Sequence, residues 1–114
     1  MTKVEFITKE TDDSGAVRIC GFRVSGHSGY AEAGADVVCA IVSTAVSLAE
    51  TTICDVCGIK ARVQVREEDA YVSLSLPASC EEEETVQAVL SGMMLTLCNA
   101  RDEYPDYLEV LEVY

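Results

Sequence analysis

The chain has 114 residues, which is enough for one domain (residues 1–114) and too few for two. Its net charge of −12 disfavours binding to nucleic acid and to anionic membrane surfaces, because like charges repel. Hydrophobic residues make up 49% of the chain, a share typical of a well-cored globular protein rather than a disordered one.

Two further features bear on the compartment. The first ten residues lack the pattern of a signal peptide, and the longest apolar run, Val37–Val42, is far shorter than the roughly 20 residues that span a bilayer. We therefore expect a cytoplasmic protein without membrane contact, whose six cysteines are reduced thiols.

The first half of the chain predicts two strands and a helix. Residues 4–8 form a short apolar run typical of a strand, and residues 16–25 alternate as a strand does. They flank a turn signal at 12–15, which predicts a hairpin with a bulge near Gly21. A glycine-bearing loop over 26–35 follows. Asp36 is a suitable N-cap for a helix that runs to about Thr52. That helix is apolar nearly all round, which places it in a core or against a partner.

The second half repeats this pattern. Residues 59–66 and 70–76 alternate between apolar and polar side chains, which predicts a second hairpin with one buried face. Ser79 and Glu82 fit a capping box for a helix that ends near Ala100, and residues 107–113 predict a last strand. The order ββαββαβ indicates an α+β fold: two layers, with a mixed, mostly antiparallel sheet and two helices packed on one face.

His27 and Cys39 are the strongest candidates for chemistry. The chain has one histidine, His27, and Cys39 falls in the first turn of the helix predicted to start at Asp36. Free backbone N–H groups at a helix start favour a thiolate, and could hold the oxyanion of a tetrahedral intermediate. Histidine is the side chain best suited to accept a proton near neutral pH. The pair fits a cysteine nucleophile with its base, although a buried structural cysteine and a surface histidine fit the spacing too.

Supporting roles follow for nearby residues. Asp36 is foremost a cap but could also orient His27, and Ser43 lies one turn beyond Cys39 on the same helix face. Gly29 and Gly34 could hinge a loop over substrate, or simply form turns.

The pair Cys54 and Cys57 forms a lone CxxC motif. A structural zinc needs four ligands, and Cys80 and Cys98 are distant in sequence. A redox CxxC normally opens a helix, whereas this one ends a helix. We therefore expect no metal and no cofactor.

The segment around the pair resembles a known signature. Gly26-His27, the loop with Gly34, then Asp36-Val37-Val38-Cys39-Ala40 and Ser43 look like the motif of the ribosomal-processing cysteine protease family, Prp. The resemblance extends over the whole chain in length and in element order. Small departures are Ser28, where the family often has alanine, Ala35 between Gly34 and Asp36, and the Cys54/Cys57 pair.

The resemblance implies a cytoplasmic bacterial homodimer in which His27 and Cys39 match the catalytic pair. It implies removal of the N-terminal extension of a basic large-subunit ribosomal protein (number twenty-seven), for ribosome assembly. The family's cleavage motif has bulky aromatic residues before the cut and a small residue after it, and residues 28–35 match the segment over the site.

These observations give one leading hypothesis and two alternatives. The leading hypothesis is a cysteine endopeptidase that acts on that ribosomal protein. The first alternative is a non-enzymatic module that binds a ribosomal protein or an assembly factor. The second is a zinc or redox protein built on Cys54 and Cys57.

Overall fold

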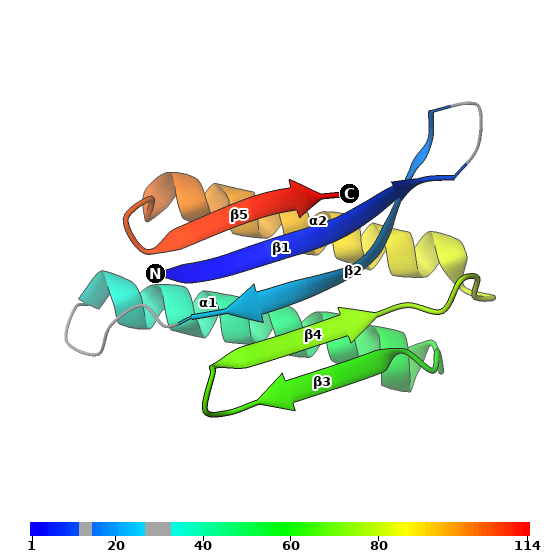
Figure 1. Ribbon diagram of the computed structural model, residues 1–114, viewed down its shortest axis with the longest axis horizontal. Coiled ribbons are helices and arrows are strands. Elements are labelled where there is room, and N and C mark those ends of the chain that lie inside the picture. Colours follow the sequence, from blue (N-terminus) through cyan, green and yellow to red (C-terminus); the bar gives the residue numbers. More distant parts are fainter. Residues whose placement is uncertain (12–14, 27–32) are drawn as a thin grey trace.

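The computed structural model describes residues 1–11, 15–26 and 33–114, with residues 33–35 described by their helical backbone alone. Its elements follow the predicted order (Figure 1). They are strands β1 (Thr2–Glu10) and β2 (Val17–Ser25), helix α1 (Ala33–Glu50) with the π-helical turn η1 (Thr51–Val56), strands β3 (Arg62–Arg66) and β4 (Tyr71–Ser75), helix α2 (Glu83–Glu103) and strand β5 (Leu108–Val113).

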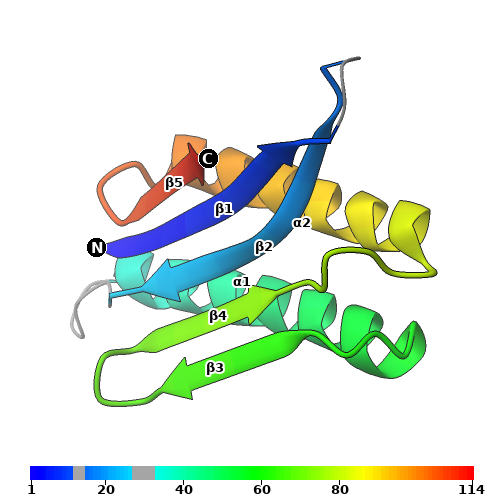
Figure 2. The ribbon, with the colours of Figure 1, turned by 45° about the vertical axis from the view of Figure 1, so that its right-hand side comes forward.

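In the described part of the chain the strands form one sheet in the order β3-β4-β2-β1-β5. All neighbouring strands are antiparallel except β1 and β5, which are parallel (Figure 2). The predicted bulge is confirmed, because the β1–β2 register shifts where Ile7 pairs with Gly21 and Thr8 pairs with Ile19. Gly21 is required there, since a Cβ atom would lie 2.1 Å from the carbonyl oxygen of Leu74.

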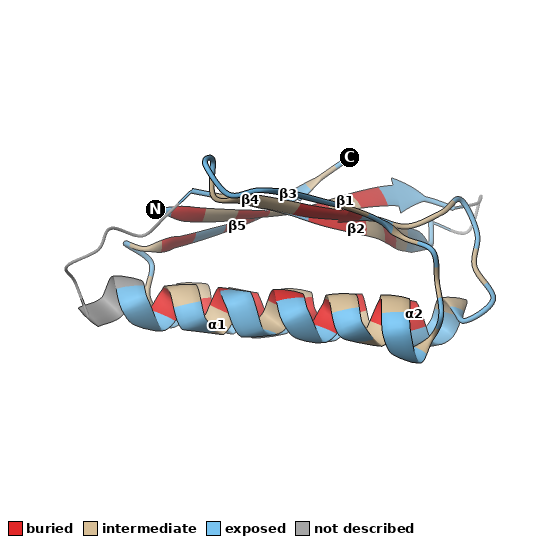
Figure 3. Ribbon diagram, turned by 90° about the horizontal axis from the view of Figure 1, so that it is seen from below, coloured by how far each residue is buried: buried red, intermediate tan, exposed pale blue. Residues whose placement is uncertain are grey.

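Both helices cover one face of the sheet, and their buried stripes point toward it (Figure 3). The core between the two layers contains Phe6 and Phe22 from the sheet, Val38 and Ile53 from the first helix, and Leu90 from the second, all nearly or fully inaccessible. The predicted α+β class, with a mixed sheet and two helices on one face, is therefore confirmed.

The first helix is longer at both ends than predicted. It begins at Ala33 rather than after Asp36, and the π-helical turn carries it to Val56. Alanine is the best helix former, so Ala33 and Ala35 extend the helix backward through Gly34. At the other end Gly58, with φ of +68°, takes a conformation that glycine adopts readily, and the helix stops.

The predicted capping box at the start of α2 is wrong. The N-cap is Glu82, without a side-chain cap, and Ser79 lies before it. The helix start is held by tertiary contacts instead. Glu83 accepts from Arg18 Nε at 2.5 Å, and the Gln87 side chain bonds both the N–H and the carbonyl oxygen of Ile19 at 2.8 Å. These bonds tie α2 to β2 beside its bulge.

The stretch Asp36–Val56 meets the length and hydropathy of a membrane span, with 21 residues and a mean hydropathy of 1.8. The run Val37–Val42 alone did not indicate this, because threonines and serines divide the later apolar residues. Core helices of water-soluble proteins have the same composition, and this helix packs its buried stripe on the sheet. Its outer face nevertheless leaves apolar side chains exposed, Leu48 among them.

Candidate active site

Cys39 lines a cleft at one end of the molecule. The cleft has a volume of about 350 Å³ and lies between the first half of α1, the end of β2 and the β3–β4 hairpin. Figure 1 shows these three segments at the same end of the sheet. We call it the Cys39 cleft; it is lined by Thr2, Val24, Gly26, Cys39, Val42, Ser43, Val46, Ser47, Val65, Arg66, Glu67, Ala70, Tyr71 and Val72.

Cys39 is half-buried in the second turn of α1. Because the helix starts at Ala33, the backbone N–H groups of Val38 and Cys39 fall within the i→i−4 hydrogen-bonding ladder. The predicted role of these two amides as free oxyanion donors is therefore wrong. The prediction failed because it took Asp36 as the N-cap, which would have left the N–H groups of Val38 and Cys39 in the first helical turn.

Ser43 lies in the same cleft as Cys39, as the one-turn spacing predicted. Ser47, one turn further along, also lines it, and both serines are exposed. The cleft therefore has a polar ridge of one thiol and two hydroxyls along α1. The spacing of four residues that singled out Ser43 also pointed to Ser47, which the sequence interpretation omitted.

The other predicted site residues are placed less directly. His27 and Gly29 lie outside the described residues. Gly26, the residue before His27, lines the Cys39 cleft, so the chain leaves β2 at the cleft. Position 26 requires glycine for two reasons. The backbone has φ of +84°, and a Cβ atom on Gly26 would lie 2.5 Å from the carbonyl oxygen of Met1.

Asp36 and Gly34 take different places from those predicted. Asp36 is exposed in the first turn of α1 and is not its N-cap, although a carboxylate there still complements the helix dipole. Gly34 lies within α1, so it does not serve as a loop hinge. Asp36 does not line the Cys39 cleft.

The hairpin turn between β3 and β4 forms the wall opposite α1. Arg66 bonds Asp69 at 3.1 Å and its guanidinium lies 4.0 Å from the centroid of the Tyr71 ring. Ala70 has φ of +50°, a left-handed conformation that is unusual for alanine and tightens the turn. The sequence located this turn but gave no sign that it faces Cys39, because the two are joined only by the fold.

The CxxC cysteines lie at the far end of α1 from Cys39. Cys54 is half-buried in the π-helical turn, and burial raises the pKa of its thiol, which the neighbouring Glu50 carboxylate raises further. A protonated thiol is a poor nucleophile and a poor metal ligand. Among the described residues no three side chains are arranged to hold a metal ion.

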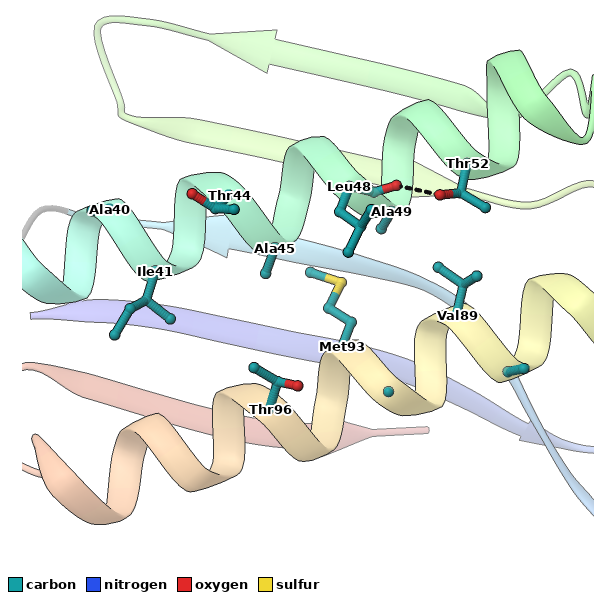
Figure 4. A pocket seen from close by; sticks show the side chains of 12 residues that line it. Ala40, Ile41, Thr44, Ala45, Leu48, Ala49, Thr52, Val89, Met93 and Thr96 are labelled. Carbon is teal, nitrogen blue, oxygen red and sulfur yellow. Dashed lines mark hydrogen bonds between the residues drawn. The ribbon is translucent and has the colours of Figure 1, made fainter.

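A second hollow lies on the other side of α1, between it and α2. It has a volume of about 690 Å³ and an almost wholly apolar lining. In Figure 4, Ala45 and Leu48 of α1 face Met93 of α2 across it. We call it the helix groove; it is lined by Ala40, Ile41, Thr44, Ala45, Leu48, Ala49, Thr52, Ala88, Val89, Gly92, Met93 and Thr96.

Comparison with known proteins decides the family. The family model described as cysteine protease Prp matches residues 1–109. The chain belongs to the cysteine protease Prp family. It is also 30% identical over 94 residues to the ribosomal processing cysteine protease Prp of Bacillus subtilis (strain 168), covering 81% of this chain and 84% of that protein. The predictions of family and of a cysteine protease activity are thereby confirmed.

Solved structures of low sequence identity share the fold of this chain. SMU.848 from Streptococcus mutans superposes with a TM-score of 0.84 at 23% identity, covering 99% of this chain and 94% of the other. The ribosomal processing protease Prp from S. aureus, in complex with a substrate peptide, has a TM-score of 0.80 at 17% identity, covering 98% and 99%. At these identities the likeness shows the fold.

Proposed function

We propose that this protease removes the N-terminal extension of a basic large-subunit ribosomal protein, number twenty-seven, with Cys39 as nucleophile and His27 as base. The observation that carries the proposal is the Cys39 cleft, in which the candidate nucleophile and Gly26, the residue preceding the candidate base, line one cavity. The substrate class is the one that the resemblance implies. The B. subtilis relative is named for ribosomal processing, in keeping with it.

The chemistry follows from these two side chains. The Cys39 sulfur attacks the carbonyl carbon of the scissile peptide bond as His27 accepts the thiol proton. The C–N bond then breaks, His27 returns the proton to the departing amine, and a thioester joins the substrate acyl group to Cys39. Water, deprotonated by His27, hydrolyses the thioester and restores the thiol. An orienting role for Asp36 remains part of the proposal, and Gly29 is the remaining candidate hinge.

The charge of the chain supports a basic substrate. A net charge of −12 attracts a cationic ribosomal protein and speeds its encounter with the enzyme. This attraction is screened by salt, so cleavage of the full-length substrate should slow as ionic strength rises. Reduced thiols at all six cysteines suit a cytoplasmic location, which we propose as well.

The decisive experiment is incubation with a synthetic extension peptide and mass spectrometry of the products. We expect one cut in the wild type and none with Cys39→Ala or His27→Ala. The matched control is the double variant Cys54→Ala/Cys57→Ala, which should cleave normally. Cleavage that survives Cys39→Ala would contradict the proposed nucleophile, and cleavage lost in the double variant would favour the redox or zinc alternative. A protein that binds the peptide without ever cutting it would be the binding module.

We also propose that the enzyme is a homodimer that pairs through the helix groove. No charged residue occurs between Asp36 and Glu50 in α1 or between Glu84 and Arg101 in α2, in a chain where a quarter of the residues are charged. Leu48 and Leu95 on these stretches are 65% and 64% exposed. A charge-free apolar face suits a second copy, because two chains of net charge −12 repel each other least where no charged side chains face one another.

A further inference from the structure

Val65 ends a row of four valines that crosses the helix-facing side of the sheet. Cross-strand pairing joins Val4 to Val24, Val24 to Val72, and Val72 to Val65. Exposure rises along the row: Val4 and Val24 are buried, Val72 is half-buried, and Val65 is 63% exposed. The apolar core therefore continues outward along this row and emerges at the edge strand β3.

The neighbouring row behaves differently. It runs from Phe6 through Phe22 and Leu74 to Val63, and its edge member Val63 is half-buried and packs against the core. The two edge valines occupy equivalent faces of β3, so their strand position alone does not explain the exposure of Val65. The difference is that Val65 lines the Cys39 cleft and Val63 does not.

Both walls of the cleft combine polar and apolar side chains. The α1 wall carries Cys39, Ser43 and Ser47 beside Val42 and Val46, and the sheet wall carries Val24, Val65 and Val72 beside Arg66 and Glu67 of the hairpin. An extended peptide presents its backbone polar groups to its sides while successive side chains point to opposite faces. Such a peptide can place its backbone beside the serines and one side chain against the valines. The volume of about 350 Å³ is at the low end for ligand pockets, so it admits one or two side chains.

We infer that Val65 is a specificity-determining residue, which sets the size of the apolar substrate side chain that the cleft accepts next to the scissile bond. The inference rests on the proposed function, because it takes Cys39 as the reacting atom. Val65 is suited to this role because it belongs to an edge strand, where a change of side-chain size alters the cleft without disturbing the core.

The test compares three extension peptides that carry Phe, Leu or Ala at the residue before the cut. Val65→Phe fills the cleft, so the ratio of kcat/KM for Phe over Ala should fall at least tenfold relative to the wild type. Val65→Thr keeps the volume but adds a hydroxyl, and should lower kcat/KM for Phe and Leu more than for Ala. The matched control is Val17→Phe, because Val17 is an exposed valine at the end of β2 that lies away from the Cys39 cleft.

Binding to the Cys39→Ala protein, with and without Val65→Phe, is measured for the same peptides by fluorescence anisotropy. This second readout gives the peptide selectivity even if no cleavage occurs. Absence of cleavage in the wild type would contradict the proposed function alone. The inference about Val65 would be overturned if Val65→Phe left the peptide selectivity unchanged in both binding and cleavage. A shift of equal size in Val17→Phe would overturn it too.

Discussion

The two sides of helix α1 face cavities of opposite character. One side carries the thiol of Cys39 and the hydroxyls of Ser43 and Ser47 into a cleft closed by the β3–β4 hairpin. The other side carries Ile41, Ala45 and Leu48 into the helix groove shared with α2. Helix α1 thus presents a thiol and two hydroxyls, beside Val42 and Val46, on one side, and an apolar surface interrupted by Thr44 on the other.

This contrast shows why the larger hollow is not the better candidate for chemistry. The helix groove has about twice the volume of the Cys39 cleft, but the described residues that line it include no titratable side chain and only the hydroxyls of three threonines. A reaction on a peptide bond needs a nucleophile and a proton acceptor, whereas association needs apolar area. The two cavities therefore point to two different tasks, catalysis and pairing.

The largest effect should follow from a charge in the helix groove. Leu48→Glu buries a carboxylate in the proposed interface, so we expect the dimer dissociation constant to rise at least a hundredfold. Analytical ultracentrifugation measures it. Val56→Glu is the control, since Val56 is exposed on the π-helical turn outside the groove. A wild-type protein that stays monomeric at high concentration and binds phosphatidylcholine vesicles would instead assign this face to a membrane.

A smaller effect should follow on the cleft side. Ser43→Ala removes a hydroxyl that can bond substrate, and a loss of about 1–1.5 kcal/mol corresponds to roughly tenfold in kcat/KM. Thr44→Ala is the matched control, because Thr44 is the next residue but lines the groove. The measurement is peptide cleavage followed by chromatography. Equal losses in the two variants would mean that the two sides of α1 are not functionally distinct.

The smallest effect concerns the ion pair between Arg18 and Glu83, which lines neither the Cys39 cleft nor the helix groove. The Arg18 guanidinium lowers the pKa of the Glu83 carboxyl, with a further contribution from the Cys80 thiol. Glu83→Gln should therefore reduce the free energy of unfolding by about 1 kcal/mol at pH 7, a value kept low because the Glu83 side chain is 39% exposed. Cleavage per folded molecule should not change.

The pH dependence of this effect follows from the sign of the shift. A carboxyl with a lowered pKa in the folded state stabilises the protein above its unfolded pKa, near 4.3, and loses this contribution as pH falls through the folded value. Urea unfolding of wild type and Glu83→Gln should therefore differ at pH 7, and the difference should shrink as the pH falls below about 4.3. A difference that does not depend on pH would show that the ionised pair is not its source.

Local patterns were sufficient for most of the fold. Period-two alternation located the strands, the shift of inward face at Gly21 marked the bulge, and the apolar stripe from Val86 to Leu97 located α2. Helix ends were less predictable. Ala33 and Ala35 moved the start of α1 back, and the start of α2 depends on Arg18, which is 65 residues away in sequence from Glu83. No local motif contains a contact of that range.

By itself the sequence determined the family, the candidate pair His27 and Cys39, and the order of the elements, because all three follow from the spacing of residues that are close together in the chain. Only the tertiary structure decided that Cys39 lies in the second helical turn, that Ser47 and Val65 share its cleft, and that the opposite side of α1 is an apolar groove. The physical reason is that a cavity is made by elements that meet only when the chain folds. The spacing of residues along one element says which face they share but not what faces them.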